Sequence, residues 1–578
     1  MASLTSKMAT SSLQQTPYNN YFVGEKDLKY VPPYFRDTPE TTTEVSCVTK
    51  GLWPEWVNGT FIRIGAGKFI IPTSEDDSKP NAVLQHFFDG LGILHKFTMS
   101  DGQVRYTSRY TAEGVVRKAQ KDGFVSTTMF GVNANYPSLK NAQDPCSALL
   151  GAQQSVFVPK GHLPPDGANV NVVPRRGMHL PKDTNPLSRG VASANPEEEE
   201  ILVHTDFNML QVCDAKTLEP KRLLTYADIN TELSGFGICA HPPKDRKRGH
   251  TYNYLISQTG VMSIFALDIV AKPAKLIWKT ALPCKPCYIH SMAMTQEYVV
   301  FIRNPLHMDV SDTTKQVMEM IEFEADAQTL FFVLNKSDGK HIAIYAAPNF
   351  MFFHSVNAYD YIDETTGDVN LHVDLCSYES DFVPYREYSL SNVVDPAQPF
   401  QDGTLVRYEL AAINKANLNR VSRATVAQAI PGVALELPRI SKYMSMNPSY
   451  RYVYATGGNG GASPGTEVPI GRLGNGVKVV QAAFFSSIVK TDWQTGKFLR
   501  WQPENGESCP CEPVFIARPG AQNEDDGIVL TIVIDKKGTH SILVALHGRD
   551  LKEVARADMP QVYGIGPHGS FVESRGMY

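Results

Sequence analysis

Short strand-like runs recur from one end of this chain to the other, and they constrain its fold more than any other feature. Runs rich in Val, Ile, Thr, Tyr and Phe are typical of β-strands, and the chain carries them in strings such as TFIRIGAGKFII, HTYNYLISQT, VMSIFALDI and GIVLTIVID. Turn sequences such as SDG, TTG and TGK separate these runs. Few stretches have the period of a long amphipathic helix. The pattern therefore predicts an all-β fold and favours a β-propeller over a helical or doubly wound α/β architecture.

The same pattern predicts the domain organisation. A chain of 578 residues would hold roughly three or four domains of average size, but large closed β architectures exceed that average. We predict a disordered N-terminal arm over residues 1–25, whose sequence is mostly polar, and a single propeller domain over residues 26–578. Three stretches interrupt the strand pattern: residues 112–165 mix helix-like and loop sequence, residues 174–200 predict a solvated surface loop, and the glycine-rich residues 457–476 predict a long loop over one face. We expect a loop and helix cap over one face of the propeller.

Composition and charge exclude several classes of protein. The hydrophobic fraction of 42% and the charged fraction of 20% are those of an ordinary globular protein. The formal net charge of −5 gives no basic footprint, so we expect no nucleic-acid partner. No apolar run is long enough for a membrane-spanning helix, and the N-terminus lacks the apolar core of a signal peptide. These observations predict a cytoplasmic protein.

Nine cysteines at irregular spacings do not form a disulfide framework, which fits a reducing compartment. Two close pairs occur, Cys284 with Cys287 and Cys509 with Cys511. A four-thiolate zinc site across the two pairs is one interpretation. Buried or loop thiols are the simpler one.

Four histidines lie in short apolar or turn settings, in the strings GICAHPPKD, CYIHSMAM, FFHSVNAYD and YGIGPHGSF: His241, His290, His354 and His568. The first three are separated by 49 and 64 residues, close to one propeller blade of roughly 40–50 residues with some insertion. A propeller brings one strand of each blade to a common axis, so these side chains could converge there. Four imidazoles suit a first-row metal such as Fe, Cu, Ni or Zn better than Mg or Ca. For each histidine taken alone, a hydrogen-bonded core residue is the alternative.

Three acids are candidates to support such a site. Glu436 in GVALELPRI and Glu512 in CPCEPVFIARPG stand in apolar strings, and we expect Asp206 in ILVHTDFNML to be less buried. A metal-binding imidazole usually has its other ring N–H held by a carboxylate, and an acid in apolar surroundings is costly unless it is paired. The alternative for Glu436 and Glu512 is a salt bridge with Arg439 or Arg518.

Together these strings resemble the carotenoid cleavage oxygenase family. The likeness runs from about residue 40 to the C-terminus. It begins with GLWPEWVNGTFIRIGAGKF and HFFDGLGILHKF, includes AHPPKD, IHSMAMTQEYVVF, FFHSVNAYD and EPVFIARPGAQNEDDGIVL, and ends with VYGIGPHGSF. Several independent motifs in the family's order make the resemblance specific.

The resemblance implies a seven-bladed β-propeller with one axial Fe(II) ion per chain, held by His241, His290, His354 and His568. It also implies three carboxylates behind the last three of these histidines: Glu436, Glu512 and, where the family usually has Glu, the shorter Asp206. One histidine would then be held less tightly, or through water. Thr205 and Val170, in GANVNVVP, resemble residues near the iron that limit access to a coordination position.

The family reaction is oxidative cleavage of a polyene double bond to two carbonyl products, with both oxygen atoms taken from O2. The resemblance therefore implies an apolar carotenoid and O2 as partners, and apocarotenals as products. No dinucleotide fingerprint is present in the sequence, which fits a reaction without a redox cosubstrate.

The likeness is greatest to fungal members that cleave torulene or β-carotene. We predict torulene-type cleavage in neurosporaxanthin-like apocarotenoid biosynthesis, with cleavage of β-carotene to retinal as the alternative. Stilbene-cleaving relatives tend to carry Lys where this chain has Thr205, which disfavours a phenolic substrate. Retinoid isomerohydrolases belong to the same family, and a non-catalytic propeller that binds a lipid or a protein is an alternative of a different class.

A long polyene resides in membranes or lipid droplets, so we expect peripheral contact with a lipid surface. The candidate segments are residues 145–157, where Cys146 could be acylated, and residues 317–323.

Overall fold

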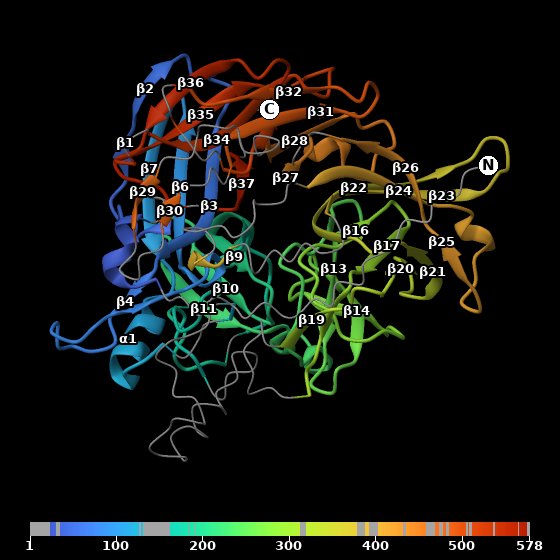
Figure 1. Ribbon diagram of the computed structural model, residues 1–578, viewed down its shortest axis with the longest axis horizontal. Coiled ribbons are helices and arrows are strands. Elements are labelled where there is room, and N and C mark those ends of the chain that lie inside the picture. Colours follow the sequence, from blue (N-terminus) through green and yellow to red (C-terminus); the bar gives the residue numbers. More distant parts are fainter. Residues whose placement is uncertain are drawn as a thin grey trace.

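Seven sheets of four or five strands surround a common axis in the part of the chain that the computed structural model describes (Figure 1). The described residues are 23–30, 35–125, 129–130, 162–182, 184–190, 192–311, 320–378, 388–391, 403–431, 435–457, 469–472, 478–480, 485–504, 507, 511–535, 538–564 and 566–574. Each sheet is one blade, and neighbouring strands within a blade are antiparallel except for β21 and β25 in blade 4. The all-β fold predicted by the strand pattern and the seven blades implied by the family resemblance are thus confirmed.

In each of the first three blades the strands follow one another from one edge of the sheet to the other. Blade 1 contains β1 (Val45–Ser46), β7 (Gln103–Tyr110), β6 (Leu91–Ser100), β3 (Gly59–Lys68) and β37 (His568–Glu573). Blade 2 contains β8 (Val173–Arg176), β9 (Glu200–His204), β10 (Leu210–Asp214) and β11 (Pro220–Leu224). Blade 3 contains β12 (Lys244–Asp245), β13 (His250–Ile256), β14 (Met262–Asp268) and β15 (Lys275–Ala281).

The other four blades follow in chain order. Blade 4 contains β16 (Ala293–Met294), β17 (Tyr298–Arg303), β20 (Thr329–Asn335), β21 (His341–Ala347) and β25 (Val421–Arg423). Blade 5 contains β22 (Met351–Ile362), β23 (Val369–Tyr378), β24 (Thr404–Leu410) and β26 (Thr425–Ile430). Blade 6 contains β27 (Leu435–Arg439), β28 (Tyr452–Gly457), β31 (Ser487–Asp492) and β32 (Phe498–Trp501). Blade 7 contains β33 (Val514–Ala517), β34 (Gly527–Ile534), β35 (Ser541–His547), β36 (Glu553–Asp558) and β2 (Val48–Gly51).

Short ribbons and helices decorate the ring. The two-stranded ribbons are β4 (Ile70–Ile71) with β5 (Ala82–Val83), β18 (Leu306–Met308) with β19 (Ile321–Phe323), and β29 (Pro469–Arg472) with β30 (Lys478–Val480). The α-helices within the described residues are α1 (Glu113–Asp122) and the single turn α3 (Pro196–Glu199). The 3-10 turns are η1 (Glu25–Tyr30), η3 (Phe87–Asp89), η4 (Tyr226–Asp228), η5 (Thr231–Leu233), η6 (Ile413–Lys415) and η7 (Lys442–Met444).

Both ends of the chain close the ring. The C-terminal strand β37 pairs with β3, with His568 opposite Ile64, while β2 near the N-terminus pairs with β36 of the last blade. In Figure 1 the blue and red strands accordingly lie side by side. Closure pairs strand edges that would otherwise be exposed.

The strand pattern of the sequence arises because the blades pack face to face. Every residue of β34 is buried, and so are six of the seven residues of β13, whereas the outer strand β15 is largely accessible. The SDG turn between β6 and β7 is a two-residue loop in which Asp101 and Gly102 have φ of 50° and 69°. Positive φ at both positions matches the twist of a tight hairpin.

Several predictions fall on residues outside the described part of the chain. They concern the acylation of Cys146 with the segment 145–157, Cys509 of the alternative zinc site, and residues 317–319 of the second lipid-contact segment. The boundary of the N-terminal arm stays a prediction, although Val23 is buried and donates its backbone N–H to Gln85. Among the described helices, none is both long and apolar enough to cross a bilayer.

Candidate metal centre

Four histidine side chains from four different blades meet on the axis. His241 and His290 stand three residues before β12 and β16, His354 lies within β22, and His568 is the first residue of β37. Their ligand nitrogens all lie within 4.8 Å of one another. The Nε2 atom of His241 is 3.1 Å from Nε2 of His290 and 3.0 Å from Nε2 of His568, and the His354 and His568 Nε2 atoms are 3.3 Å apart. The structure thus brings together all four histidines singled out in the sequence.

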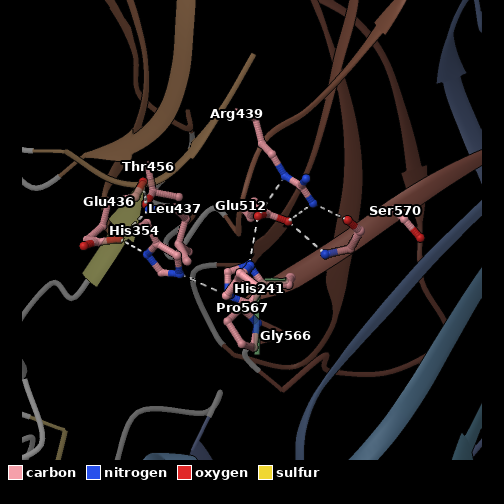
Figure 2. Close-up of polar contacts among 12 residues, drawn as sticks. His241, His354, Glu436, Leu437, Arg439, Thr456, Glu512, Gly566, Pro567 and Ser570 are labelled. Atoms are coloured by element: carbon pink, nitrogen blue, oxygen red, sulfur yellow. Dashed lines mark hydrogen bonds and ion pairs between the residues drawn. The ribbon is translucent and has the colours of Figure 1, made fainter. Parts of the chain in front are cut away.

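Three of these histidines have a carboxylate behind the ring. The Nδ1–H of His290 donates to Asp206, at 3.0 Å from Oδ1 and 2.9 Å from Oδ2. Nδ1 of His568 donates to Oε1 of Glu512 at 2.9 Å. Nδ1 of His354 donates to Oε2 of Glu436 (Figure 2). Each carboxylate fixes the proton on Nδ1 and leaves the Nε2 lone pair free.

The acids and histidines together draw one residue from every blade. Asp206 follows β9 of blade 2, Glu436 lies in β27 of blade 6, and Glu512 stands two residues before β33 of blade 7. His568, His241, His290 and His354 belong to blades 1, 3, 4 and 5 or to the segments directly before them. The centre is therefore assembled only when the whole ring has closed.

A β-bulge in β27 allows this strand to carry Glu436 and also to place Arg439 beside Glu512. The register between β27 and β28 shifts between Glu436 and Arg439, and Leu437 adopts φ of 53°. A left-handed conformation costs a branched residue about 1 kcal/mol or more. It allows the Leu437 N–H to donate to Oε2 of Glu436 at 2.7 Å. Arg439 extends the other way and pairs with Glu512 (Figure 2).

Burial and neighbouring charges lower the pKa values of His241, His568 and Glu512. Burial lowers the pKa of His241 well below its usual value, and the neighbouring histidines lower it further. Burial also lowers the pKa of His568 to about 3, against the opposing effect of Glu512. Burial alone would raise the pKa of Glu512, but Arg439 and His568 bring it to about 2. His241 and His568 therefore present neutral nitrogens with free lone pairs to the axis.

This donor set fits a small divalent metal ion. Nitrogens at adjacent positions of one ion, each bonded at about 2.0–2.1 Å, lie about 3 Å apart, as three of the Nε2 pairs do. Lone pairs at that separation repel one another unless a cation lies between them. Among the described side chains that contact the three acids, Arg439 is the only permanent cation, so two buried negative charges lack a permanent counter-charge. Imidazole nitrogen suits Fe, Cu, Ni and Zn.

The structure corrects two expectations about the acids. Asp206 was expected to be the less buried one, yet it is 7% exposed, like Glu436. Its side chain contacts Ala240, in the segment before blade 3, and Tyr288 and His290, in the segment before blade 4. The shorter acid was also expected to hold its histidine loosely or through water, but the contact with His290 is direct. For Glu512 both interpretations hold, since it binds His568 and also pairs with Arg439. Arg518 pairs with Asp526 instead.

Thr205 and Val170 are buried, at 3% and 0% exposure. Thr205 directly precedes Asp206, and Val170 belongs to the same core cluster as Phe353 and Tyr288. Their role in controlling access to a metal stays a prediction. Of the cysteines in the alternative zinc site, the described ones, Cys284, Cys287 and Cys511, are free thiols. Within the described residues, the histidine cluster is the one group of side chains that could hold a metal ion.

Sequence reasoning missed the aromatic residues around the centre. The ring of Phe353 stacks on His290 with centroids 4.0 Å apart, and Phe88 is parallel to Phe353 at 5.9 Å. Phe130 contacts Phe88 at 5.3 Å and Tyr288 at 6.4 Å. Phe353 and Tyr288 stand next to, or two residues from, a predicted ligand, which is the only local signal for them. One side of the centre is thus lined by aromatic rings.

Comparisons with known proteins agree with this geometry. The family model described as retinal pigment epithelial membrane protein matches residues 34–573. A protein named torulene dioxygenase from Fusarium fujikuroi is 28% identical to this chain, covering 90% of it and 89% of the relative. A carotenoid dioxygenase from Neurospora crassa is 25% identical, covering 93% of this chain and 90% of the relative.

A solved structure shares the fold. The cobalt-substituted apocarotenoid oxygenase of Synechocystis aligns with a TM-score of 0.68 at 19% identity, covering 94% of this chain and 99% of that one.

Proposed function

We propose that this chain, which belongs to the carotenoid oxygenase family, cleaves a C=C bond of a carotenoid polyene with O2 to give two carbonyl products. The observation that carries the proposal is the axial cluster of four histidines, three of them backed by a buried carboxylate. A propeller that served only as a scaffold would gain nothing from burying three acids against neutral imidazoles, because burial of ionised groups is costly. The geometry therefore favours a catalytic role over a binding module.

We propose one Fe(II) ion per chain as the cofactor, held by His241, His290, His354 and His568. When bound, Fe(II) with open coordination positions supplies the electrons and the binding sites that O2 needs in order to react with an alkene. The four imidazoles carry no charge, so they leave the charge of the ion undiminished. Asp206, Glu436 and Glu512 keep the proton on Nδ1 and so keep Nε2 available.

The reaction balances without a further reductant. One C=C bond and one O2 molecule become two C=O groups, and each product receives one oxygen atom. The task left to the protein is to place one bond of a long apolar chain beside the metal and to keep water away. Phe353, Phe88 and Phe130 present ring faces and edges next to His290. Such a surface suits a flat, unsaturated hydrocarbon.

We propose a torulene-type carotenoid as the substrate, in neurosporaxanthin-like apocarotenoid biosynthesis, with β-carotene as the alternative. The relative named torulene dioxygenase supports this choice. A phenolic stilbene is disfavoured because Thr205, and no lysine, precedes Asp206. We also propose peripheral contact with a membrane or lipid droplet, since the substrate is too apolar to be free in water.

The test is an aerobic incubation of the Fe(II)-loaded protein with torulene, β-carotene and resveratrol in detergent, with products identified by mass spectrometry. Apocarotenals would support the proposal, and their masses would identify the bond that is cut. Cleavage of resveratrol alone would move the chain to the stilbene-cleaving group. Absence of products from protein that binds iron would refute the oxygenase and favour an isomerohydrolase. Absence of both iron and products would favour the binding module.

His354→Ala and His372→Ala form a matched pair for this assay. Both residues lie in blade 5, but His372 contacts Tyr359 and Tyr361 rather than the axial cluster. The proposal requires loss of product with the first variant and normal turnover with the second.

A further inference from the structure

Every acid behind the histidines accepts three kinds of hydrogen bond. Each one accepts from a histidine Nδ1, from a backbone N–H and from one further side chain. In that order, the donors are His290, Ala240 and Tyr288 for Asp206; His354, Leu437 and Tyr378 for Glu436; and His568, Gly569 and Arg439 for Glu512. The third donor is therefore a regular part of the centre.

Tyr288 occupies an unusual place among these donors. Its hydroxyl donates to Oδ2 of Asp206 at 2.8 Å. The hydroxyl oxygen of Tyr288 also lies 3.3 Å from Nδ1 of His290. Tyr288 is 4% exposed, so its hydroxyl is largely shielded from bulk water. The phenol oxygen thus lies within hydrogen-bond distance of both the carboxylate and the imidazole.

Asp206 also reaches a second histidine through the backbone. Its Oδ1 accepts from the N–H of Ala240 at 3.2 Å, directly before His241. Among the described residues, no carboxylate is bonded to the His241 ring, unlike the other three. The backbone N–H of His241 donates to the carbonyl of His290 at 3.4 Å. The position of His241 therefore depends on the segment that Asp206 holds.

We propose that Tyr288 is a positioning residue that fixes Asp206 and, through it, both His290 and His241. This inference rests on the proposed function, because it assumes that these histidines bind a metal. The hydroxyl restrains a short acid that would otherwise be free to rotate between the two donors. Loss of a partner behind a ligand typically weakens metal binding by about 10- to 100-fold. We expect Tyr288→Phe to weaken metal binding about 10-fold. This variant removes a single hydrogen bond, and that bond is made to the carboxylate behind the histidine rather than to the histidine itself.

The test measures Co(II) affinity by competition with a chelator and records the visible absorption of the bound Co(II), without any turnover. Tyr288→Phe should weaken binding about 10-fold and change the absorption bands, because the ligand field depends on how His290 is oriented. Asp206→Asn should weaken binding at least as much. The double variant should be no worse than Asp206→Asn alone, because the hydroxyl acts through the carboxylate.

Tyr254→Phe is the matched control. The Tyr254 hydroxyl is buried and donates to the carbonyl of Ile289 at 3.1 Å, one residue before His290, but it does not contact Asp206. Its removal should lower the unfolding temperature of the metal-free protein and leave Co(II) affinity within about twofold of wild type. Equal losses of affinity with Tyr254→Phe and Tyr288→Phe would reduce Tyr288 to a packing role and overturn the proposal.

The remaining outcomes separate the inference from the proposed function. Wild-type protein that binds neither Co(II) nor Fe(II) would refute the metal centre itself. Wild-type binding together with unchanged binding by Tyr288→Phe would overturn only the role of Tyr288. If Tyr288→Phe does not fold, Asp206→Asn decides: wild-type affinity in that variant would overturn the proposal, and a loss of 10-fold or more would support it.

Discussion

Glu436 and Glu512 each hold a histidine, but exchanging each for Gln should have different consequences. Oε2 of Glu436 accepts from both His354 Nδ1 and the Leu437 N–H, while Oε1 meets only the hydroxyl of Tyr378. In Glu436→Gln the amide oxygen can take the place of Oε2, where it accepts from His354 Nδ1 and the Leu437 N–H. The amide NH2 can donate to Tyr378, because a hydroxyl also accepts. His354 therefore keeps its proton on Nδ1, and its Nε2 stays available.

Glu512 has no such freedom, because both of its oxygens face donors only. Oε1 lies 2.9 Å from Nδ1 of His568 and 2.9 Å from Nε of Arg439; Oε2 lies 2.8 Å from the Gly569 N–H and 3.1 Å from Nη2 of Arg439. In Glu512→Gln the amide NH2 must face either the donors at Oε1, which are His568 and Arg439, or the donors at Oε2, which are the Gly569 N–H and Arg439. If the amide NH2 faced Gly569, the buried N–H of Gly569 would lose its acceptor, at a cost of about 1–3 kcal/mol.

The amide should therefore face His568, which can accept on Nδ1 if its proton moves to Nε2. Arg439 is 38% exposed and can turn towards water. A preference of about 1–3 kcal/mol for this tautomer corresponds to roughly a 5- to 150-fold penalty on metal binding, since Nε2 must lose its proton first. For Glu436→Gln we expect a loss below about 10-fold, from the weaker hydrogen bond of a neutral acceptor.

The assay is Co(II) or Fe(II) affinity by chelator competition, with the unfolding temperature of the metal-free proteins as a control for folding. The ranking is the decisive result: Glu512→Gln should bind metal more weakly than Glu436→Gln although both retain folded structure. Equal losses, or a greater loss in Glu436→Gln, would refute the tautomer argument.

Four further predictions concern the centre and the fold. His354→Ala should abolish product formation by the Fe(II)-loaded protein, whereas His372→Ala should retain it; turnover by the first variant would contradict the ligand assignment. Burial opposes ionisation of Asp245, but its bond to Lys336 contributes to a folded-state pKa of about 2, below the ordinary 3.8. Because this pKa is lowered on folding, ionised Asp245 should add about 2 kcal/mol to the free energy of unfolding above pH 4, and this contribution should be lost as the pH falls from 4 to 2. Acid unfolding of the wild type and of Asp245→Asn would measure the difference. Gly102→Ala should cost about 1 kcal/mol in thermal unfolding without changing metal affinity, because φ of 69° disfavours a side chain. Free metal at about 100 times its Kd should stabilise the protein by about 2.7 kcal/mol, and an unfolding temperature that ignores a chelator would count against a metal bound to the folded state.

The blades could be predicted from sequence, because strands packed on both faces give short apolar runs such as the fully buried β34. The number seven could not be obtained from those runs, since strand length does not encode how many blades close a ring. It came from the resemblance to a known family. The four histidines were recognisable because each lies in an apolar or turn string at the start of a blade or within its inner strand.

The partners of the acids were less accessible to sequence reasoning. Tyr288 bonds to Asp206 across 82 residues of chain, and Tyr378 bonds to Glu436 across 58. Such contacts exist only after blades have packed, and no local pattern marks them. The depth of Asp206 was misjudged for the same reason, because its side chain contacts the segments before blades 3 and 4, which are distant from it in sequence.

The arrangement of the centre also ties metal binding to closure of the ring. Strand β37 closes blade 1 by pairing with β3, and its first residue, His568, is one of the four histidines. Glu512, which holds that histidine, belongs to blade 7, whose outer edge is closed by β2 from the other end of the chain. A state in which either terminal strand has detached loses His568 or loosens the blade that supports it. Metal that binds only the closed ring therefore stabilises the pairing of both chain ends, by an amount that grows with the ratio of free metal to Kd.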